Sequence, residues 1–178
     1  MSIIAGKELY DLVLKKVITA DPSQINTSSI DVTLGDEILM ESPDGDVVDI
    51  AAKQSIKWDK VKIGDEGIVI YPGQVFLANT REFFNLPADI SATFVLKSSI
   101  ARNFLNHMLA GYADAGWNGS TLTMEFKNES MFHPLLIKKG MRIGQMVFHK
   151  HIDTGEMSYG LKGNYNGQKT VTAAYGNK

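Results

Sequence analysis

The sequence predicts a mainly β domain, an antiparallel sandwich or barrel led by one helix. Three observations favour this class. The first two are many short apolar segments and the turn signals that occur about every ten residues between them. The third is chain length. At 178 residues the chain can bury one sizeable core but is short for two domains, so we treat residues 1–178 as one domain.

The N-terminal segment is expected to form an amphipathic helix over residues 6–18. Leu9, Leu12, Val13 and Val17 recur at helical spacing and fall on one stripe. No basic stretch followed by an apolar core precedes this segment, and no apolar run approaches membrane-spanning length. We therefore expect a cytoplasmic protein without a secretory signal.

Strand patterning begins after the segment "DPSQINTSS". Ile30, Val32 and Leu34 alternate with polar residues, and this pattern is expected to stop at Gly35. A short helical insert is expected near residues 98–106. Further strands are expected at 37–40, 47–50, 67–71, 75–80, 90–96, 121–126, 134–137 and 143–149. The turn signals between them are "SPDGD", "YPGQ", "NLPAD", "WNGS" and "IKKGM".

Composition excludes several classes of function. A net charge of −2 gives no broad attraction to nucleic acid or membranes, so an anionic ligand needs a local cluster of cations. The chain has no cysteine, which excludes disulfides, thiolate catalysis and zinc sites built on Cys. His149 and His151 could share a face of a strand, but such a pair is more often solvated than metal-binding. We expect no metal ligand from the protein.

The segment "LKSSIAR" has the character of a phosphate cradle. Ser98 opens the expected helical insert, and its simplest interpretation is a helix N-cap. A helix N-terminus also presents backbone N–H groups to anions, and Arg102 lies one turn further on the same face. Lys97 immediately precedes the serine pair, so Ser98 and Ser99 are flanked by two cations.

A glutamate interrupts the otherwise uncharged strand "TLTMEF". Thr121, Thr123 and Glu125 are expected on one face of this strand, opposite its apolar residues. A glutamate held in a partly desolvated pocket has a raised pKa and can move protons at neutral pH. Asp114, in the preceding "DAGWNG" turn, is either a turn residue or an acceptor for a sugar hydroxyl or a water.

Five motifs in order along residues 25–170 carry a family resemblance. They are "QINTSSIDVTLGDEI", "LPADISATFVLKSSIAR", "DAGWNGSTLTMEFKN", "KKGMRIGQMVF" and "YNGQK". Together they resemble the dCTP deaminase family, of the superfamily shared with trimeric dUTP diphosphatases. The resemblance implies a distorted, dUTPase-like β fold and a homotrimer. It also implies active sites at subunit interfaces, closed by a C-terminal lid at about 160–178.

The resemblance implies hydrolytic deamination of dCTP at C4, giving dUTP and ammonia. Mg²⁺ would be bound through the nucleotide triphosphate, and no zinc would be needed. Glu125 matches the catalytic glutamate, which takes a proton from water and delivers it toward N3 and the leaving amine. Ser98 matches the serine that orients this water, and Arg102 the arginine that supports the site.

The resemblance also implies a set of substrate-binding residues. They are Lys97, Ser99, Asp114, Thr123, Met124, Tyr159, Lys162 and Gln168. The first two fall in the phosphate-contacting stretch, and Asp114 lies near the deoxyribose. Thr123 and Met124 offer backbone groups to the base edge, and the last three belong to the lid region.

The chain also departs from the family pattern. Lys97 stands where the family has an arginine, which replaces a bidentate phosphate contact by a point charge. Asn164 stands at the position of the lid lysine, with Lys162 nearby. The stretch between Arg102 and Asp114 is one residue shorter than usual. These departures affect the triphosphate contacts.

Three alternatives to a dUTP-forming deaminase remain at this point. A bifunctional enzyme would deaminate dCTP and cleave the dUTP, with Asp114 activating a water aimed at the α-phosphate. A plain dUTP diphosphatase is disfavoured because the turn lacks that family's Tyr-Arg-Gly and Glu125 would have no role. A non-catalytic nucleotide-binding regulator is disfavoured because Ser98 and Glu125 are both present.

Overall fold

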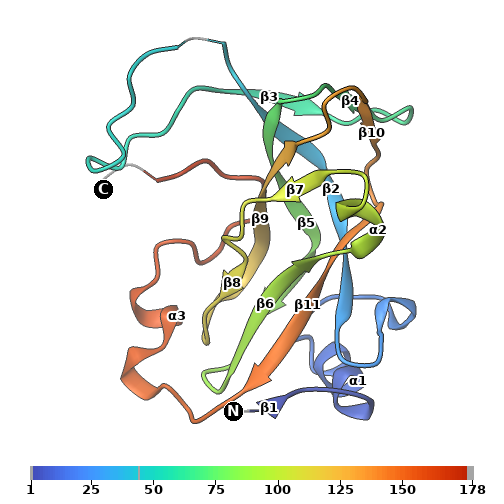
Figure 1. Ribbon diagram of the computed structural model, residues 1–178. Helices are drawn as coiled ribbons and strands as arrows, with labels where there is room; N and C mark the ends of the chain where they lie inside the picture. The colour runs from blue at the N-terminus through green and yellow to red at the C-terminus, as the bar shows by residue number, and fades with distance from the viewer. Residues whose placement is uncertain (1, 44, 176–178) are drawn as a thin grey trace.

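The computed structural model describes residues 2–43 and 45–175, and it confirms a mainly β domain with few helices. Nine strands form one antiparallel sheet that curls into a half-barrel, in the order β7-β9-β5-β2-β11-β6-β8, with β1 on β11 and β3 on β2 (Figure 1). These strands are β1 (Ser2–Ile3), β2 (Ile30–Glu41), β3 (Trp58–Lys62), β5 (Val75–Asn85), β6 (Ile90–Leu96), β7 (Leu105–His107), β8 (Tyr112–Ala113), β9 (Asn118–Asn128) and β11 (Arg142–Lys150).

A second, two-stranded sheet joins β4 (Ile68–Ile70) to β10 (Leu135–Ile137). The helices are short: α1 (Lys7–Leu14), α2 (Ser98–Ala101) and α3 (Tyr159–Lys162), with 3-10 turns η1 (Pro22–Gln24) and η2 (Gly155–Met157). No helix in the described part of the chain is long and apolar enough to cross a membrane.

The N-terminal helix forms as predicted, with Leu9 and Leu12 buried, but it is shorter than residues 6–18. It ends at Leu14, and Lys16 adopts a left-handed backbone conformation with φ 56°. A left-handed residue interrupts the helical hydrogen-bond ladder, so Val17 reaches the core from the turn that follows the helix.

Gly35 does not end the first predicted strand. β2 runs through it without interruption to Glu41, and its register against β5 shifts between Leu34 and Ile38. A Cβ at Gly35 would lie only 2.5 Å from Asn79 Oδ1, so the glycine allows two strands to approach closely. Glycine inside a strand commonly marks such an irregularity rather than an end.

The strand predicted at 47–50 is wrong. This stretch lies in the connection between β2 and β3, where Val47 and Ile50 are largely exposed. β2 instead pairs with Trp58–Lys62, a strand that the sequence pattern did not indicate because charged residues dominate it. Alternation alone does not form a strand when no neighbour supplies hydrogen bonds.

Most of the buried apolar side chains form one core cluster. Its largest fully buried side chains include Phe76, Phe84, Phe126, Phe148, Ile30, Leu34 and Ile38. Phe76 and Phe126 stack across β5 and β9 with ring centroids 5.2 Å apart. This packing fixes β9, the strand that carries Glu125.

Candidate active site

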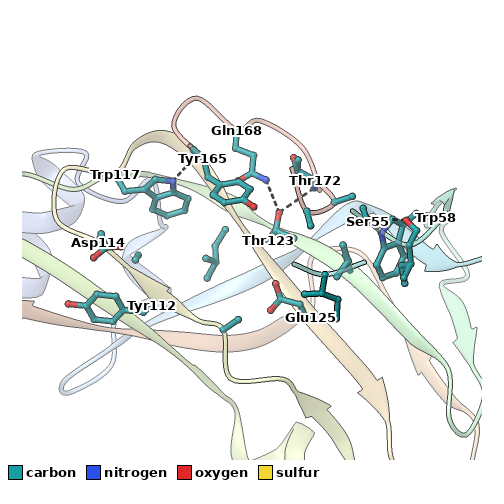
Figure 2. A pocket seen from close by; sticks show the side chains of 18 of the residues that line it. Ser55, Trp58, Tyr112, Asp114, Trp117, Thr123, Glu125, Tyr165, Gln168 and Thr172 are labelled. Atoms are coloured by element: carbon teal, nitrogen blue, oxygen red, sulfur yellow. Dashed lines mark hydrogen bonds between the residues drawn. The ribbon is translucent and has the colours of Figure 1, made fainter. Parts of the chain in front are cut away.

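One cavity of about 580 Å³ lies beside the middle of β9, with C-terminal residues forming part of its wall (Figure 2). It brings together five of the predicted site residues: Asp114, Thr123, Glu125, Tyr159 and Gln168. Much of the remaining lining is apolar, including Trp117 and Leu122. A mostly apolar cavity with a few convergent polar groups is the usual form of a small-molecule site.

Glu125 points into this cavity from the centre of β9, where its backbone pairs with Leu77 of β5. Its side chain is 30% exposed, and burial raises the pKa of its carboxyl group above the ordinary value of 4.5. Within the described residues, Oε2 has no hydrogen-bond partner. A partly buried carboxyl group with a free oxygen is suited to proton transfer.

The C-terminal tail is bound to β9 through Thr123, two residues before Glu125. Thr123 Oγ1 accepts hydrogen bonds from Gln168 Nε2 at 3.2 Å and from the backbone N–H of Thr172 at 3.3 Å (Figure 2). The backbone N–H of Thr121 donates to the carbonyl of Gln168 at 2.7 Å. Tail residues therefore form a wall of the cavity, although residues 176–178 of the expected lid lie outside the described residues.

Asp114 lies at the turn that leads into β9, and its side chain is exposed. The backbone N–H of Trp117 donates to the Asp114 carbonyl at 3.2 Å, which closes the turn. Gly116 has φ +86°, and a Cβ there would collide with the Ser158 hydroxyl. The backbone N–H of Tyr159 donates to the carbonyl of Ala115 at 2.9 Å, so this turn also positions Tyr159.

A second cavity of about 340 Å³ adjoins the first. The two cavities share Asp114 and Tyr159, and the second also contains Lys162 and Asn164. Lys162 Nζ lies 3.2 Å from Met157 Sδ, a weak contact that leaves the ammonium group near the cavity. Asn164, at the predicted position of the lid lysine, and the nearby Lys162 therefore both line the second cavity, which meets the first at Asp114.

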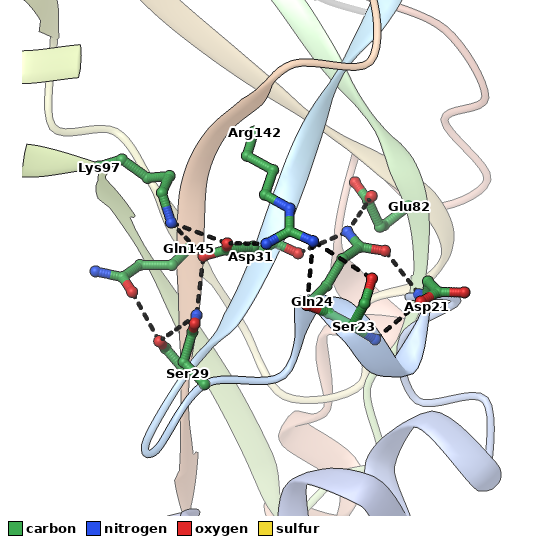
Figure 3. A network of polar contacts seen from close by, with 10 residues as sticks. Asp21, Ser23, Gln24, Ser29, Asp31, Glu82, Lys97, Arg142 and Gln145 are labelled. Atoms are coloured by element: carbon green, nitrogen blue, oxygen red, sulfur yellow. Dashed lines mark hydrogen bonds and ion pairs between the residues drawn. The ribbon is translucent and has the colours of Figure 1, made fainter. Parts of the chain in front are cut away.

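Lys97 is held in an ion pair rather than presented to the cavity. Its Nζ contacts both carboxylate oxygens of Asp31 at 2.8 Å (Figure 3). Asp31 is 1% exposed and is also approached by Arg142 Nη1 at 3.4 Å and Asn26 Nδ2 at 2.9 Å. A phosphate would have to share the Lys97 ammonium group with Asp31. The role of Lys97 as a phosphate ligand therefore stays a prediction.

Ser98, Ser99 and Arg102 do not line either cavity in the single chain. They lie on or beside α2, which appears to the right of β9 in Figure 1 while α3 and the tail lie to its left. The interpretation of Ser98 as an N-cap is wrong: Lys97 is the cap residue, without a side-chain cap bond, and Ser98 is the first helical residue. Glu125 therefore lines the cavity without its two predicted catalytic partners.

Met124 is fully buried, and its side chain points into the core because strand residues alternate in direction. Any contact of Met124 with a base must therefore come from its backbone, as the sequence predicts.

Sequence reasoning missed several cavity residues. Tyr112, Tyr165 and Trp58 line the cavity, as do Val48 and Ile50 from the connection before β3. His107, on β7, lies 3.7 Å from Glu125 and was not assigned a role. Its strand is only three residues long, which gives too short a pattern to read. The connection before β3 gave no sign of a binding role either. Val48 and Ile50 come to line the same cavity as the tail residues only in the folded chain.

The described residues include no group of three or more His, Asp or Glu side chains that could hold a metal ion. The cavity itself offers two carboxyl groups, those of Asp114 and Glu125. Mg²⁺ is commonly bound through one or two carboxylates together with substrate phosphates. The donor set therefore fits a Mg²⁺ carried on a nucleotide, with Asp114 as the available carboxylate.

Comparisons with known proteins identify the family of this chain. A family model described as dCTP deaminase-like matches residues 3–151. A protein of Persephonella marina named "dCTP deaminase, dUMP-forming" is 36% identical over 176 residues, which cover 97% of this chain and 96% of its own. A protein of the same name from Aquifex aeolicus is 34% identical and covers 95% of this chain and 92% of its own.

Among solved structures, the 2′-deoxycytidine 5′-triphosphate deaminase of Agrobacterium tumefaciens has a similar fold. The TM-score is 0.66 at 22% identity, over 83% of this chain. The match covers 48% of the Agrobacterium chain, so this protein spans about half of its length.

The relatives correct one expectation. The sequence led us to expect dUTP as the product, yet the Persephonella and Aquifex proteins are both named as dUMP-forming. The expectation of a dUTP-producing deaminase is therefore wrong, and the bifunctional alternative agrees better with the relatives.

Proposed function

Because this chain belongs to the dCTP deaminase family, as its motifs predicted, we propose that it converts dCTP to dUMP. The two hydrolytic steps consume two waters and release ammonia and pyrophosphate. The observation that carries the proposal is that Glu125 and Asp114 line the same cavity. Tail residues also line this cavity, and Asp114 lies where it adjoins the second cavity. One bound nucleotide could thus meet both carboxyl groups.

The base would lie beside Glu125. In its ionised form this carboxylate takes a proton from the water that attacks C4, and it returns the proton toward N3 and the leaving amine. The raised pKa of Glu125 brings its proton affinity closer to that of the groups it serves at neutral pH. Thr123, bound to Gln168 and Thr172, holds the tail over this part of the cavity.

The phosphate chain would extend past Asp114 toward the second cavity and Lys162. Asp114 would accept a proton from the water that attacks the α-phosphate, with pyrophosphate as the leaving group. Mg²⁺ on the triphosphate would neutralise the charge that develops on the phosphate oxygens. Tyr159 is shared by the two cavities and would lie beside the sugar and phosphates.

We further propose a homotrimer in which a neighbouring copy supplies Ser98 and Arg102. Neither residue lines the cavity that contains Glu125 in one chain, and Arg102, which directly follows α2, is exposed. A site with Glu125 but no cation for the reacting water would be incomplete. Symmetric oligomers commonly complete such sites across an interface.

The direct test incubates the purified protein with dCTP and Mg²⁺ and separates the products by anion-exchange chromatography. We expect dUMP, pyrophosphate and ammonia in equal amounts, with little free dUTP. Glu125→Gln is the matched control and should form none of these. Accumulation of dUTP as the end product, or untouched dCTP, would contradict the proposal.

A further inference from the structure

The buried side chain of His107 faces Glu125, which lines the cavity. His107 ends β7, which pairs with β9 so that His107 lies opposite Phe126. The side chain of His107 is 4% exposed, and its Nε2 lies 3.7 Å from Glu125 Oε2. Within the described residues, neither of these two atoms has a hydrogen-bond partner. Two buried polar atoms that face each other and lack other partners call for an explanation.

The surroundings of the ring identify which nitrogen carries the proton. The backbone N–H of Leu109 donates to His107 Nδ1 at 3.3 Å, so Nδ1 is an acceptor and the proton resides on Nε2. The ring is held between Phe94, with centroids 4.6 Å apart, and the edge of Phe126, with centroids 5.7 Å apart. The Nε2–H group therefore points toward the Glu125 carboxyl group from a fixed ring.

Burial also keeps the imidazole neutral. Desolvation lowers the pKa of His107 to about 4, so the ring is uncharged near pH 7. Glu125 therefore faces a neutral N–H donor rather than a cation. Leu77, the β5 partner of Glu125, is not titratable, and the Lys127 ammonium on β9 is paired with Glu129 at 3.2 Å. The other titratable groups that line the cavity are Asp114, Tyr112, Tyr159 and Tyr165.

We infer that His107 is a positioning residue: its Nε2–H holds Glu125 Oε2, turns Oε1 toward the substrate and stabilises the ionised carboxylate. This inference rests on the proposed role of Glu125 as the proton shuttle. Catalytic hydrogen bonds are often long without substrate and tighten in the complex, here by a contraction from 3.7 Å to about 2.9 Å. His107 itself touches no reacting atom.

The pH dependence of kcat separates this role from a structural one. His107→Leu removes the donor, whereas His107→Gln keeps an N–H at a similar reach. Loss of the donor disfavours the ionised form of Glu125. The acidic limb of the pH profile of kcat therefore moves to higher pH in the Leu variant. On that limb kcat falls by about tenfold, while KM changes little. The Gln variant should recover most of the loss, and equal losses in both variants at every pH would overturn the inference.

A titration without turnover keeps the two proposals apart. The ¹³C carboxyl resonance of Glu125 is assigned by its disappearance in Glu125→Gln and is followed against pH. We expect it to titrate at higher pH in His107→Leu than in the wild type, and unchanged titration would overturn the inference. If the wild type fails to turn over dCTP, the proposed function falls, and this titration still decides whether His107 acts on Glu125.

A further measurement is made on the wild-type protein itself. The ¹⁵N spectrum of its imidazole groups, with His107 assigned by the Gln variant, reports the tautomer and charge. We expect a neutral ring protonated at Nε2 at pH 7. A ring protonated at Nδ1, or a charged ring, would overturn the inference.

Discussion

At the scale of single residues, two glutamates show how surroundings decide a role. Glu82 is buried at 4% exposure and accepts three hydrogen bonds, from Gln24 Nε2 and from the backbone N–H and hydroxyl of Thr33, all within 2.7–2.9 Å. Glu125 is more exposed, yet its Oε2 lacks such donors within the described residues. The carboxyl group of Glu82 is thus held by structural hydrogen bonds, whereas that of Glu125 has an oxygen left for another partner.

Glu125→Gln should abolish ammonia release while it stabilises the fold at neutral pH. A raised pKa means that the folded state favours protonated Glu125, so its contribution to stability is complete below about pH 4.5 and is lost as pH rises through the folded pKa. The neutral amide avoids that loss. Urea unfolding should therefore show equal stability of variant and wild type at pH 4 and a more stable variant at pH 8. A variant less stable at pH 8 would contradict the assignment.

At the scale of elements, one ion-pair network ties α2 to the sheet. Asp31 lies on β2, Lys97 directly precedes α2, and Arg142 begins β11 and also donates from Nη2 to the Ser23 carbonyl at 3.1 Å (Figure 3). The sequence indicated Lys97 as a phosphate ligand because it precedes the serine pair, and the pairing with Asp31 was not evident because Asp31 is 66 positions away along the chain. Only pairing of β2 with β11, and of β11 with β6, brings the two residues together.

Lys97→Met should destabilise the protein by about 2 kcal/mol, because the buried Asp31 carboxylate loses a charge-assisted donor. Lys139→Met is the matched control, since Lys139 pairs with the exposed Asp65 at 2.6 Å. That pair lies at the surface, so its loss should cost much less stability than the loss of the Lys97 pair. Denaturant unfolding of both variants measures the two losses in the free energy of unfolding. Equal losses would show that the Lys97–Asp31 pair stabilises the fold no more than a surface pair does.

The C-terminal tail is bound in part through one hydroxyl group of β9, that of Thr123. Thr123→Val keeps the shape of the side chain but removes the acceptor for Gln168 Nε2 and the Thr172 N–H. We expect faster amide hydrogen exchange over 165–175 and a KM for dCTP raised by about threefold to tenfold, for about 1 kcal/mol lost. Thr170→Val, at an exposed tail position, is the control. Unchanged exchange in the Thr123 variant would show that other contacts hold the tail.

At the scale of the whole molecule, Glu125 lines the cavity of the half-barrel, whereas no residue of α2 does. The cavity opens between β9 and the tail, whereas α2 follows β6 and leads into β7. The motif residues Ser98, Arg102 and Glu125 are close in sequence, yet the first two do not line the cavity. The proposed site, shared between copies of the chain, would account for this separation.

Mixing two inactive variants tests the shared site. Arg102→Ala and Glu125→Gln are each expected to be inactive, but in mixed trimers one copy can supply Arg102 and its neighbour Glu125. Random assembly at equal amounts then restores about a quarter of the sites. Turnover of dCTP after co-refolding measures the recovery, and light scattering measures the assembly. No recovery, or a monomeric wild type, would contradict the shared site.

The sequence by itself determined the mainly β class, the N-terminal helix, the family and the presence of Asp114, Thr123 and Glu125 in one stretch. These depend on local alternation, turn residues and motif order, all of which are written in neighbouring positions. The tertiary structure alone decided that β2 passes through Gly35, that Lys97 pairs with Asp31 and that His107 stands behind Glu125. Those facts depend on strand pairing and burial between distant segments, which no local pattern encodes.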